Sequence, residues 1–211
     1  PRPALAELRQ VSFPAQPFTK DYVIPTEIPK GLVALYWPAT DGLDQPRTRR
    51  LGMLGSVFSD RLRVKIREEL GGTYSPRAQT NASDVFPGYG YISTSIDVDP
   101  AMAARIAEAA TAIADDLAKN GVTAEELNRA RQPALTAIRQ SLRNNGYWLG
   151  SVLARAQEKP EVLDWSRTRV ADFEAITAYE LSALAKAYLG RERASRVIVI
   201  PGKKAAANSG N

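Results

Sequence analysis

The sequence contains no cysteine and no histidine among its 211 residues. Without cysteine, the chain cannot form disulfides, thiolate zinc sites or a cysteine nucleophile. Without histidine, it cannot build a serine–histidine–aspartate triad, an imidazole metal site or a histidine general base on its own. A hydrolase made from this chain would therefore need carboxylates, lysine or residues supplied by a partner.

Long apolar runs are also missing. No stretch of about 18 or more apolar residues occurs, so no transmembrane helix is predicted. The first ten residues, PRPALAELRQ, lack the apolar centre of a signal peptide. The sequence starts at Pro1 without a methionine, so we expect a piece of a longer protein, from which a signal could have been removed. The net charge of +5 is mild and dispersed, and does not by itself indicate nucleic-acid binding.

The composition allows one domain of ordinary size. With 44% hydrophobic residues, the chain can bury a core. Residues 1–30 contain five prolines after Pro1 and no sustained periodicity, so we expect an extended linker or arm with some side chains on the domain's surface. Residues 31–202 are expected to form the domain, and residues 203–211 a disordered tail.

The most strongly patterned stretch is residues 54–76, LGSVFSDRLRVKIREELGGTYSP. Its apolar residues recur in steps of three and four, which line one face of a helix, and charged residues occupy the other face. The pattern allows a break near residues 56–60. The two glycines after Leu70 can take the left-handed conformation that ends a helix. An extended segment then follows, so Tyr74 can fold back towards the last helical turn, which carries Arg67.

Four extended segments are expected to form the sheet. Residues 31–38, GLVALYWP, have the composition of a buried strand. Residues 75–83 and 89–98 fit two antiparallel strands joined by the turn DVFPG, and residues 196–200, RVIVI, a final strand.

Further helices are expected between the strands. Asp99 is an N-cap followed by proline, the residue favoured at the first helical position. Capping boxes at residues 123–126 and 177–180 start two more helices, the first of which Pro133 should kink. We also expect a helix from Tyr147 that stops before residue 160, and only a short element around Phe173.

The order of these elements predicts an α+β fold class. We expect a two-layer domain in which a largely antiparallel sheet carries the helices on one face. Alternating β-α-β units with short crossovers are missing, which argues against a doubly wound dinucleotide-binding sheet.

Three patterns admit both a functional and a structural explanation. The glycines at 71–72 and 88–90 match no phosphate-loop consensus, so turn and cap roles are favoured. Asp97 and Asp99 could belong to a metal site, but the N-cap role explains Asp99. A basic stretch lacks interleaved aromatic residues, so a solvated helix face is favoured over a nucleic-acid surface. Its members are Arg47, Arg49, Arg50, Arg61, Arg63 and Lys65.

Arg67 and Tyr74 carry chemistry that amide hydrolysis could use. An arginine can donate two parallel hydrogen bonds to a carbonyl or carboxylate, and a tyrosine hydroxyl can donate to a developing oxyanion. Neither is a nucleophile or base at neutral pH, so both would assist catalytic groups from elsewhere. Spacing alone leaves two simpler explanations open, a surface salt bridge from Arg67 to Glu68 and a packed tyrosine.

The segments SDRLRVKIREELGGTYSP, GYGYISTSIDVDP, GVTAEELNRA, NGYWLG and RVIVIPG closely resemble the C-terminal half of the insulinase-like (M16, inverzincin) zinc metallopeptidases. The resemblance points in particular to bacterial, periplasmic-type members of the PqqL kind. The resemblance covers about residues 30–202 and implies the fold of the LuxS and mitochondrial processing peptidase metallohydrolases. It implies a periplasmic location, or otherwise a cytoplasmic one.

The resemblance also implies a function. Such proteases consist of two homologous halves that close around an unfolded peptide. The N-terminal half holds zinc through an inverted HxxEH motif and a later glutamate. The C-terminal half lacks the metal and supplies an arginine that holds a substrate carbonyl, here Arg67, and a tyrosine that stabilises the tetrahedral intermediate, here Tyr74. The expected partners are the zinc-bearing half and a peptide substrate, with no nucleic acid and no membrane insertion.

The sequence departs from a complete M16 enzyme in having no HxxEH motif. No metal or cofactor is therefore expected in this chain, zinc is expected in the missing half, and the chain alone should be inactive. The alternative is a catalytically idle M16-like scaffold, against which the presence of both Arg67 and Tyr74 argues. Nucleic-acid binding through the arginines is a third reading, and would require salt-sensitive affinity.

Overall fold

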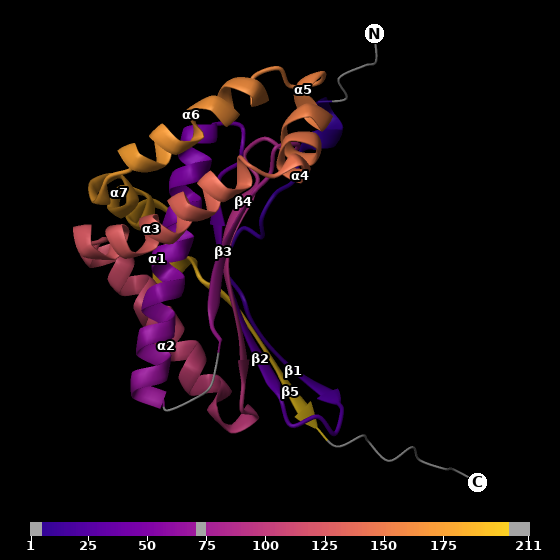
Figure 1. Ribbon diagram of the computed structural model, residues 1–211. Coiled ribbons are helices and arrows are strands. Elements are labelled where there is room, and N and C mark those ends of the chain that lie inside the picture. The colour runs from indigo at the N-terminus through magenta and orange to yellow at the C-terminus, as the bar shows by residue number, and fades with distance from the viewer. Residues whose placement is uncertain (1–5, 71–74, 203–211) are drawn as a thin grey trace.

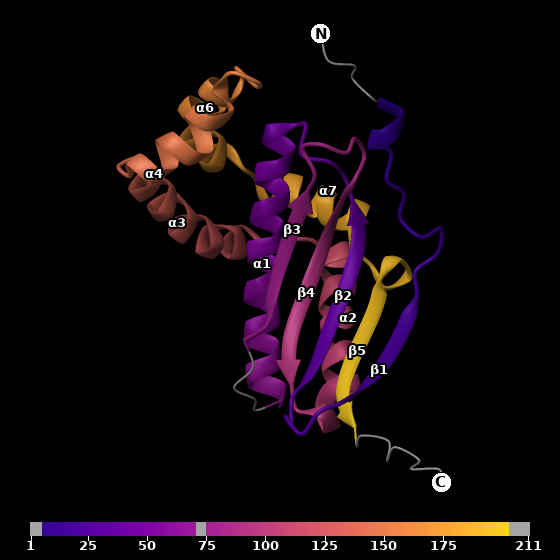
Figure 2. The same cartoon turned by 90° about the vertical axis from the view of Figure 1, so that its right-hand side faces the viewer.

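The computed structural model describes residues 6–70 and 75–202, without the side chains of residues 6, 9 and 67–70. Its framework is one five-stranded sheet in the order β1-β5-β2-β4-β3. Figure 1 shows this sheet edge-on with the helices on one side, and Figure 2 looks onto the face that the helices leave open. The strands are β1 (Thr19–Pro25), β2 (Gly31–Ala39), β3 (Arg77–Ala82), β4 (Gly90–Val98) and β5 (Ser195–Gly202).

The predicted α+β class and the one-sided helix layer are confirmed, and the sheet is mixed rather than purely antiparallel. β2 pairs antiparallel with β4 and β5, and β3 pairs antiparallel with β4, but β1 pairs parallel with β5. The predicted hairpin of β3 and β4 is confirmed. In this strand order, β1 and β3 form the two opposite edges of the sheet.

The two faces of the sheet differ because side chains alternate along each strand. Val33, Leu35 and Trp37 of β2 point into the core and are fully buried. Their neighbours Tyr36 and Pro38 point to the open face and are exposed. The sheet thus buries one face under the helices and presents the other.

The strand β1 lies inside the segment expected to be an arm. Residues 19–25 pair with β5 from Thr19 opposite Arg196 to Pro25 opposite Gly202. The segment holds Tyr22, Val23 and Ile24, which favour strands, but its partner lies at the other end of the chain. This fifth strand was not among those expected from the sequence; that residues 1–30 are a linker or arm from a preceding half stays a prediction.

The long helix α1 (Gln45–Leu70) is continuous, so a break near residues 56–60 is wrong. Val57 and Phe58 are fully buried, and the ring of Phe58 packs edge-on against Trp37 at 5.6 Å. Because buried positions continue through this stretch, packing against the sheet keeps the helix continuous.

The other long helices are α2 (Ala103–Asn120), α3 (Ala124–Ser141), α6 (Val162–Ala175) and α7 (Ala178–Tyr188). Both predicted capping boxes are present, at Thr123 of α3 and Thr177 of α7. Asp99 caps the short η2 (Pro100–Met102), which leads into α2. Among the described residues, no helix has the length and apolar character needed to cross a bilayer.

Two helical segments differ from expectation. The short element expected around Phe173 is wrong, since α6 has 14 residues. Only Val162 and Ser166 of α6 are buried, so its sequence carries little amphipathic pattern. The helix expected from Tyr147 is present but contains a π-helical segment. It consists of α4 (Asn145–Tyr147), the π-helical η3 (Trp148–Leu153) and α5 (Ala154–Ala156).

Three short 3-10 turns complete the described structure: η1 (Ala6–Arg9), η2 and η4 (Arg191–Arg193). The expected tail lies outside the described residues.

Candidate functional site

The first candidate site lies at the C-terminal end of α1. Arg67 is in the last turn of this helix, and its side chain lies outside the described part of the chain. Tyr74 also lies outside the described residues. That Tyr74 folds back towards Arg67 therefore stays a prediction. The structure does define what holds the elements on both sides of them.

On the helix side, Leu62 and Ile66 anchor the end of α1. Both side chains are fully buried against the core. Each such side chain removed from water stabilises the fold by about 1.5–3 kcal/mol. Ile66, the residue directly before Arg67, therefore attaches this part of the helix to the core.

On the strand side, Ser59 of α1 binds the start of β3. Its hydroxyl donates to the carbonyl of Ala78 at 3.0 Å and accepts from the amide of Ala78 at 2.8 Å. These two backbone groups point away from β4, at the free edge of the sheet. Ser59 thus fixes the strand to the helix just beyond the segment that contains Tyr74.

We expect Ser59→Ala to lower the free energy of unfolding by about 1–2 kcal/mol, because both backbone groups of Ala78 lose their partner. Urea denaturation of the chain measures this change. Ser56→Ala is the matched control: its hydroxyl donates to Gly52 within the same helix, so its effect should stay within about 0.5 kcal/mol. Equal effects of the two substitutions would contradict the role of Ser59.

Arg61 fixes α1 to the next two helices. Its guanidinium donates to Glu126 at 2.6 and 2.9 Å, to Asp116 at 2.5 Å and to the carbonyl of Gly121 at 2.7 Å. Glu126 is also the last residue of the α3 capping box, at the third helical position, and accepts from the amide of Thr123 at 2.9 Å. Burial raises the pKa of Glu126, but the hydrogen bonds from Arg61 and Thr123 outweigh it and lower the pKa to about 2.

The pKa of Glu126 predicts how stability depends on pH. It falls from 4.5 to about 2 on folding, so the stabilisation is complete above about pH 4.5 and disappears as the pH falls towards 2. We expect Glu126→Gln to cost about 2 kcal/mol of unfolding free energy at pH 7, with the difference from wild type narrowing below pH 4.5. Urea titrations between pH 3 and 7 test this.

Glu125→Gln is the control, since Glu125 is 81% exposed and pairs only with Arg129 four residues on. If the difference in unfolding free energy between Glu126→Gln and wild type stayed constant with pH, the charge of the Glu126 carboxylate would contribute nothing to stability.

The basic stretch of α1 forms ion pairs within the domain. Arg49 is buried and pairs with Asp172 of α6, and Arg50 donates to Glu180, the capping-box residue of α7, at 2.8 Å. Arg47, Arg61 and Arg63 also pair with carboxylates. A solvated helix face is therefore wrong for Arg49, Arg50 and Arg61, which join α1 to other helices. Their charge is neutralised locally, which removes the main argument for a nucleic-acid surface.

The acidic pair does not form a metal site among the described residues. Asp99 accepts a hydrogen bond from the amide of Ala101 at 2.9 Å, as its N-cap role requires, and Asp97 points to the open face. In residues 6–70 and 75–202, no three acidic side chains converge on a common point. With no histidine or cysteine in the chain, the residues present do not fit the zinc that the family resemblance implies.

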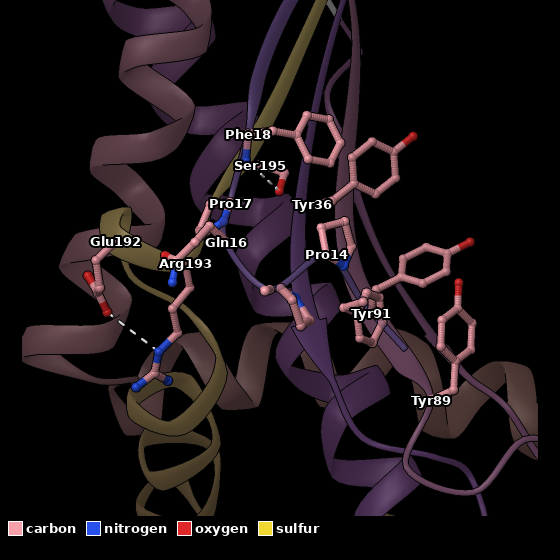
Figure 3. Close-up of a pocket in the computed structure, with 13 residues that line it drawn as sticks. Pro14, Gln16, Pro17, Phe18, Tyr36, Tyr89, Tyr91, Glu192, Arg193 and Ser195 are labelled. Carbon is pink, nitrogen blue, oxygen red and sulfur yellow. Dashed lines mark hydrogen bonds and ion pairs between the residues drawn. The ribbon is translucent and has the colours of Figure 1, made fainter. Parts of the chain in front are cut away.

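A second candidate site is an aromatic pocket on the open face of the sheet, which sequence reasoning missed. It encloses about 580 Å³ between the end of β2, the start of β5 and the segment before β1. Figure 3 shows Tyr36, Tyr89 and Tyr91 beside one another, facing the same side of the sheet. The ring of Phe13 stacks on Tyr89 at 4.7 Å, and Tyr36 meets Tyr91 edge-on at 5.9 Å.

The sequence signal for this pocket was the alternation in β2, where Tyr36 and Pro38 are out of phase with the buried Leu35 and Trp37. Tyr91 lies opposite Pro38 in the register and so shares its face. The pocket residues Tyr36 and Pro38 lie near the end of β2. The last turn of α1, which carries Arg67, lies at the other end of the sheet, where β2 begins, as the course of α1 and β2 in Figure 2 shows. The two candidate sites are thus separated by the length of α1.

Comparison with known proteins identifies the class. Residues 3–133 match the Peptidase M16 inactive domain, more than half of the chain. The chain is 30% identical over 107 residues to the chloroplastic stromal processing peptidase of Pisum sativum, a match covering 51% of this chain and 8% of that protein. The chain belongs to the M16 peptidase family, and its matching region is the family's inactive domain.

Solved structures agree with this fold. The periplasmic protease PqqL from Escherichia coli superposes with a TM-score of 0.72 at 16% identity, covering 89% of this chain and 21% of that chain. The peptidase M16 inactive domain from Pseudomonas fluorescens gives a TM-score of 0.70 at 18% identity, covering 93% of this chain and 47% of that chain. The chain thus spans less than half the length of each of these relatives.

Proposed function

We propose that this chain is the C-terminal, substrate-binding half of a zinc-dependent M16 endopeptidase. The observation that carries the proposal is the match of residues 3–133 to the family's inactive domain in a chain that has no histidine. The zinc and its HxxEH motif would then belong to the preceding half. The domain encloses an unfolded peptide together with that half.

Arg67 and Tyr74 are the residues we assign to the reaction. Arg67 would hold a backbone carbonyl of the peptide through its two parallel donors, and Tyr74 would donate to the oxyanion of the tetrahedral intermediate. Three features support the assignment: the anchoring of α1 by Leu62 and Ile66, the bond from Ser59 to β3, and the absence of a competing metal group among the described residues. The chain alone has no general base of the family type and is inactive.

The open face of the sheet is the surface we assign to the zinc-bearing half. Tyr22, Ile24 and Tyr36 lie on this face and are 47%, 44% and 39% exposed. Large exposed apolar side chains that gather on one face mark an interaction surface. The aromatic pocket lies on the same face and would receive an apolar segment of the partner.

We expect Tyr36→Glu to weaken association with the zinc-bearing half at least tenfold, because it places a charge in the centre of this face. Tyr179→Glu is the matched control, since Tyr179 is 83% exposed on α7 in the helix layer. Sedimentation velocity of the mixed halves measures both. An equal affinity for both variants would place the interface elsewhere.

The location we propose is the periplasm, as for the PqqL protease of Escherichia coli, whose structure shares the fold. The alternative function is an idle M16-like scaffold without catalysis. The parent sequence upstream of Pro1 separates the two: an HxxEH motif with a later glutamate supports the peptidase, and its absence supports the scaffold.

A further inference from the structure

A cavity on the helix side of the domain is lined by arginines without any carboxylate. It encloses about 540 Å³ between the first half of α1, the helical stretch 145–156 and α6. Three of its lining residues are Arg49, Arg155 and Arg169, and its wall also carries the hydroxyl groups of several serines and threonines. Among the residues that the structure describes, no aspartate or glutamate lines it. Its volume is in the range of cavities that bind small ligands.

Two of the arginines form ion pairs with aspartates that do not line the cavity. Arg49, whose side chain is 5% exposed, pairs with Asp172 and donates to the carbonyl of Trp165. Arg155 pairs with Asp84, which also accepts from Lys159 at 3.3 Å. These pairs fix both guanidiniums in place, so they shape the cavity more than they bind in it.

Arg169 is different because it has no carboxylate partner among the described residues. Its guanidinium lies over the ring of Tyr147 at 5.2 Å and donates weakly to the hydroxyl of Ser141 at 3.4 Å. The side chain is half-buried. A partly desolvated arginine held only by a ring and a distant hydroxyl keeps most of its donors free for an anion.

The π-helical segment η3 forms another part of the cavity wall. The amide of Ala154 bonds to the carbonyl of Leu149, five residues earlier, which is the π-helical pattern. Ser151 and Val152 from this segment line the cavity. Single π-helical turns are rare and occur frequently at functional sites. The segment begins within the NGYWLG motif, overlapping it at residues 148–150, and the proposed function leaves this motif without a role.

The floor of the cavity includes Gly52 of α1. A Cβ atom added at Gly52 would meet no atom within 4 Å, so a side chain could be introduced there without displacing the fold. A larger side chain at Gly52 therefore reduces the cavity without removing any of its arginines.

We propose that this cavity binds a carboxylate group, with Arg169 as the principal donor. A planar guanidinium matches a carboxylate with two parallel hydrogen bonds, and the surrounding hydroxyls can donate to its remaining lone pairs. The proposal rests on the cavity alone, because the cavity lies on the helix side of the domain and not on the open face that we assign to the zinc-bearing half. The source could be an acidic side chain or a C-terminus.

The test uses isothermal titration of the 211-residue chain with capped tetrapeptides. Acetyl-Ala-Ala-Glu-Ala-amide offers a side-chain carboxylate, acetyl-Ala-Ala-Ala-Ala a terminal one, and acetyl-Ala-Ala-Gln-Ala-amide none. At least one carboxylate peptide should bind about tenfold or more tightly than the neutral one, and the stronger of the two identifies the source. Inorganic phosphate serves as a competitor and should bind more weakly than that peptide.

Variants locate the site. Arg169→Gln should abolish the preference for the carboxylate peptide, and Gly52→Leu should abolish binding by filling the cavity. Arg167→Gln is the matched control, because Arg167 lies on the same helix, is 72% exposed and pairs with Asp164. Circular dichroism establishes that each variant is folded. The proposal is wrong if carboxylate and neutral peptides bind equally or not at all, if Arg169→Gln keeps the preference, or if phosphate binds best.

This titration needs neither zinc nor the other half. Its failure would leave the assignment of Arg67 and Tyr74 intact, and an inactive parent protein would leave carboxylate binding intact.

Discussion

Tyr74→Phe in the assembled peptidase should lower kcat by about 100- to 1,000-fold, which is the usual effect of removing one oxyanion donor. The oxyanion exists only in the transition state, so KM should change little. Steady-state cleavage of a fluorogenic peptide by the two combined halves measures both constants. The substitution removes only a hydroxyl, and circular dichroism verifies the fold.

Tyr179→Phe is the control for this measurement, since its exposed hydroxyl lies on α7 in the helix layer. A kcat of Tyr74→Phe equal to that of Tyr179→Phe would remove Tyr74 from the reaction. A rise in KM at constant kcat would instead assign it to substrate binding.

Arg67→Ala should reduce kcat/KM by about 10- to 100-fold, mainly through KM. The arginine is assigned to a backbone carbonyl that is present in both the substrate and the transition state, and a hydrogen bond from a charged donor contributes about 1.5–3 kcal/mol. Arg67→Lys keeps the charge but loses the planar pair of donors, so it should recover only part of the loss.

Arg63→Ala is the matched control for Arg67→Ala. Arg63 lies one turn earlier on α1, is 56% exposed and pairs with Asp60. If both alanine variants reduced kcat/KM alike, the effect would come from the helix's charge rather than from a contact made by Arg67.

Local signals in the sequence predicted the elements well. The capping boxes at Thr123 and Thr177 and the N-cap at Asp99 are formed as expected, because each depends on residues three or fewer positions apart. The hairpin of β3 and β4 was equally readable from alternation and a turn. These features together were enough for the α+β class.

Long-range features could not be read in the same way. β1 pairs with β5 at the opposite end of the chain, where Thr19 faces Arg196, and nothing local marks that pairing. Arg50 and Arg61 looked like residues of a solvated face, but Glu180 and Glu126 come to them from helices far along the sequence. The two candidate sites differ in the same way. Helix periodicity alone predicted that Arg67 lies at the end of α1. The aromatic pocket could not be predicted, because it forms only where β2, β4 and the segment before β1 meet.

The most direct test of the peptidase assignment is the zinc-dependent cleavage of one unfolded peptide by three samples: this chain, the zinc-bearing half, and both together. We expect no cleavage by this chain, little by the zinc-bearing half, and full activity from the mixture that a chelator abolishes. Zinc-dependent cleavage by this chain alone, or a zinc-bearing half whose activity the chain does not increase, would contradict the proposed function.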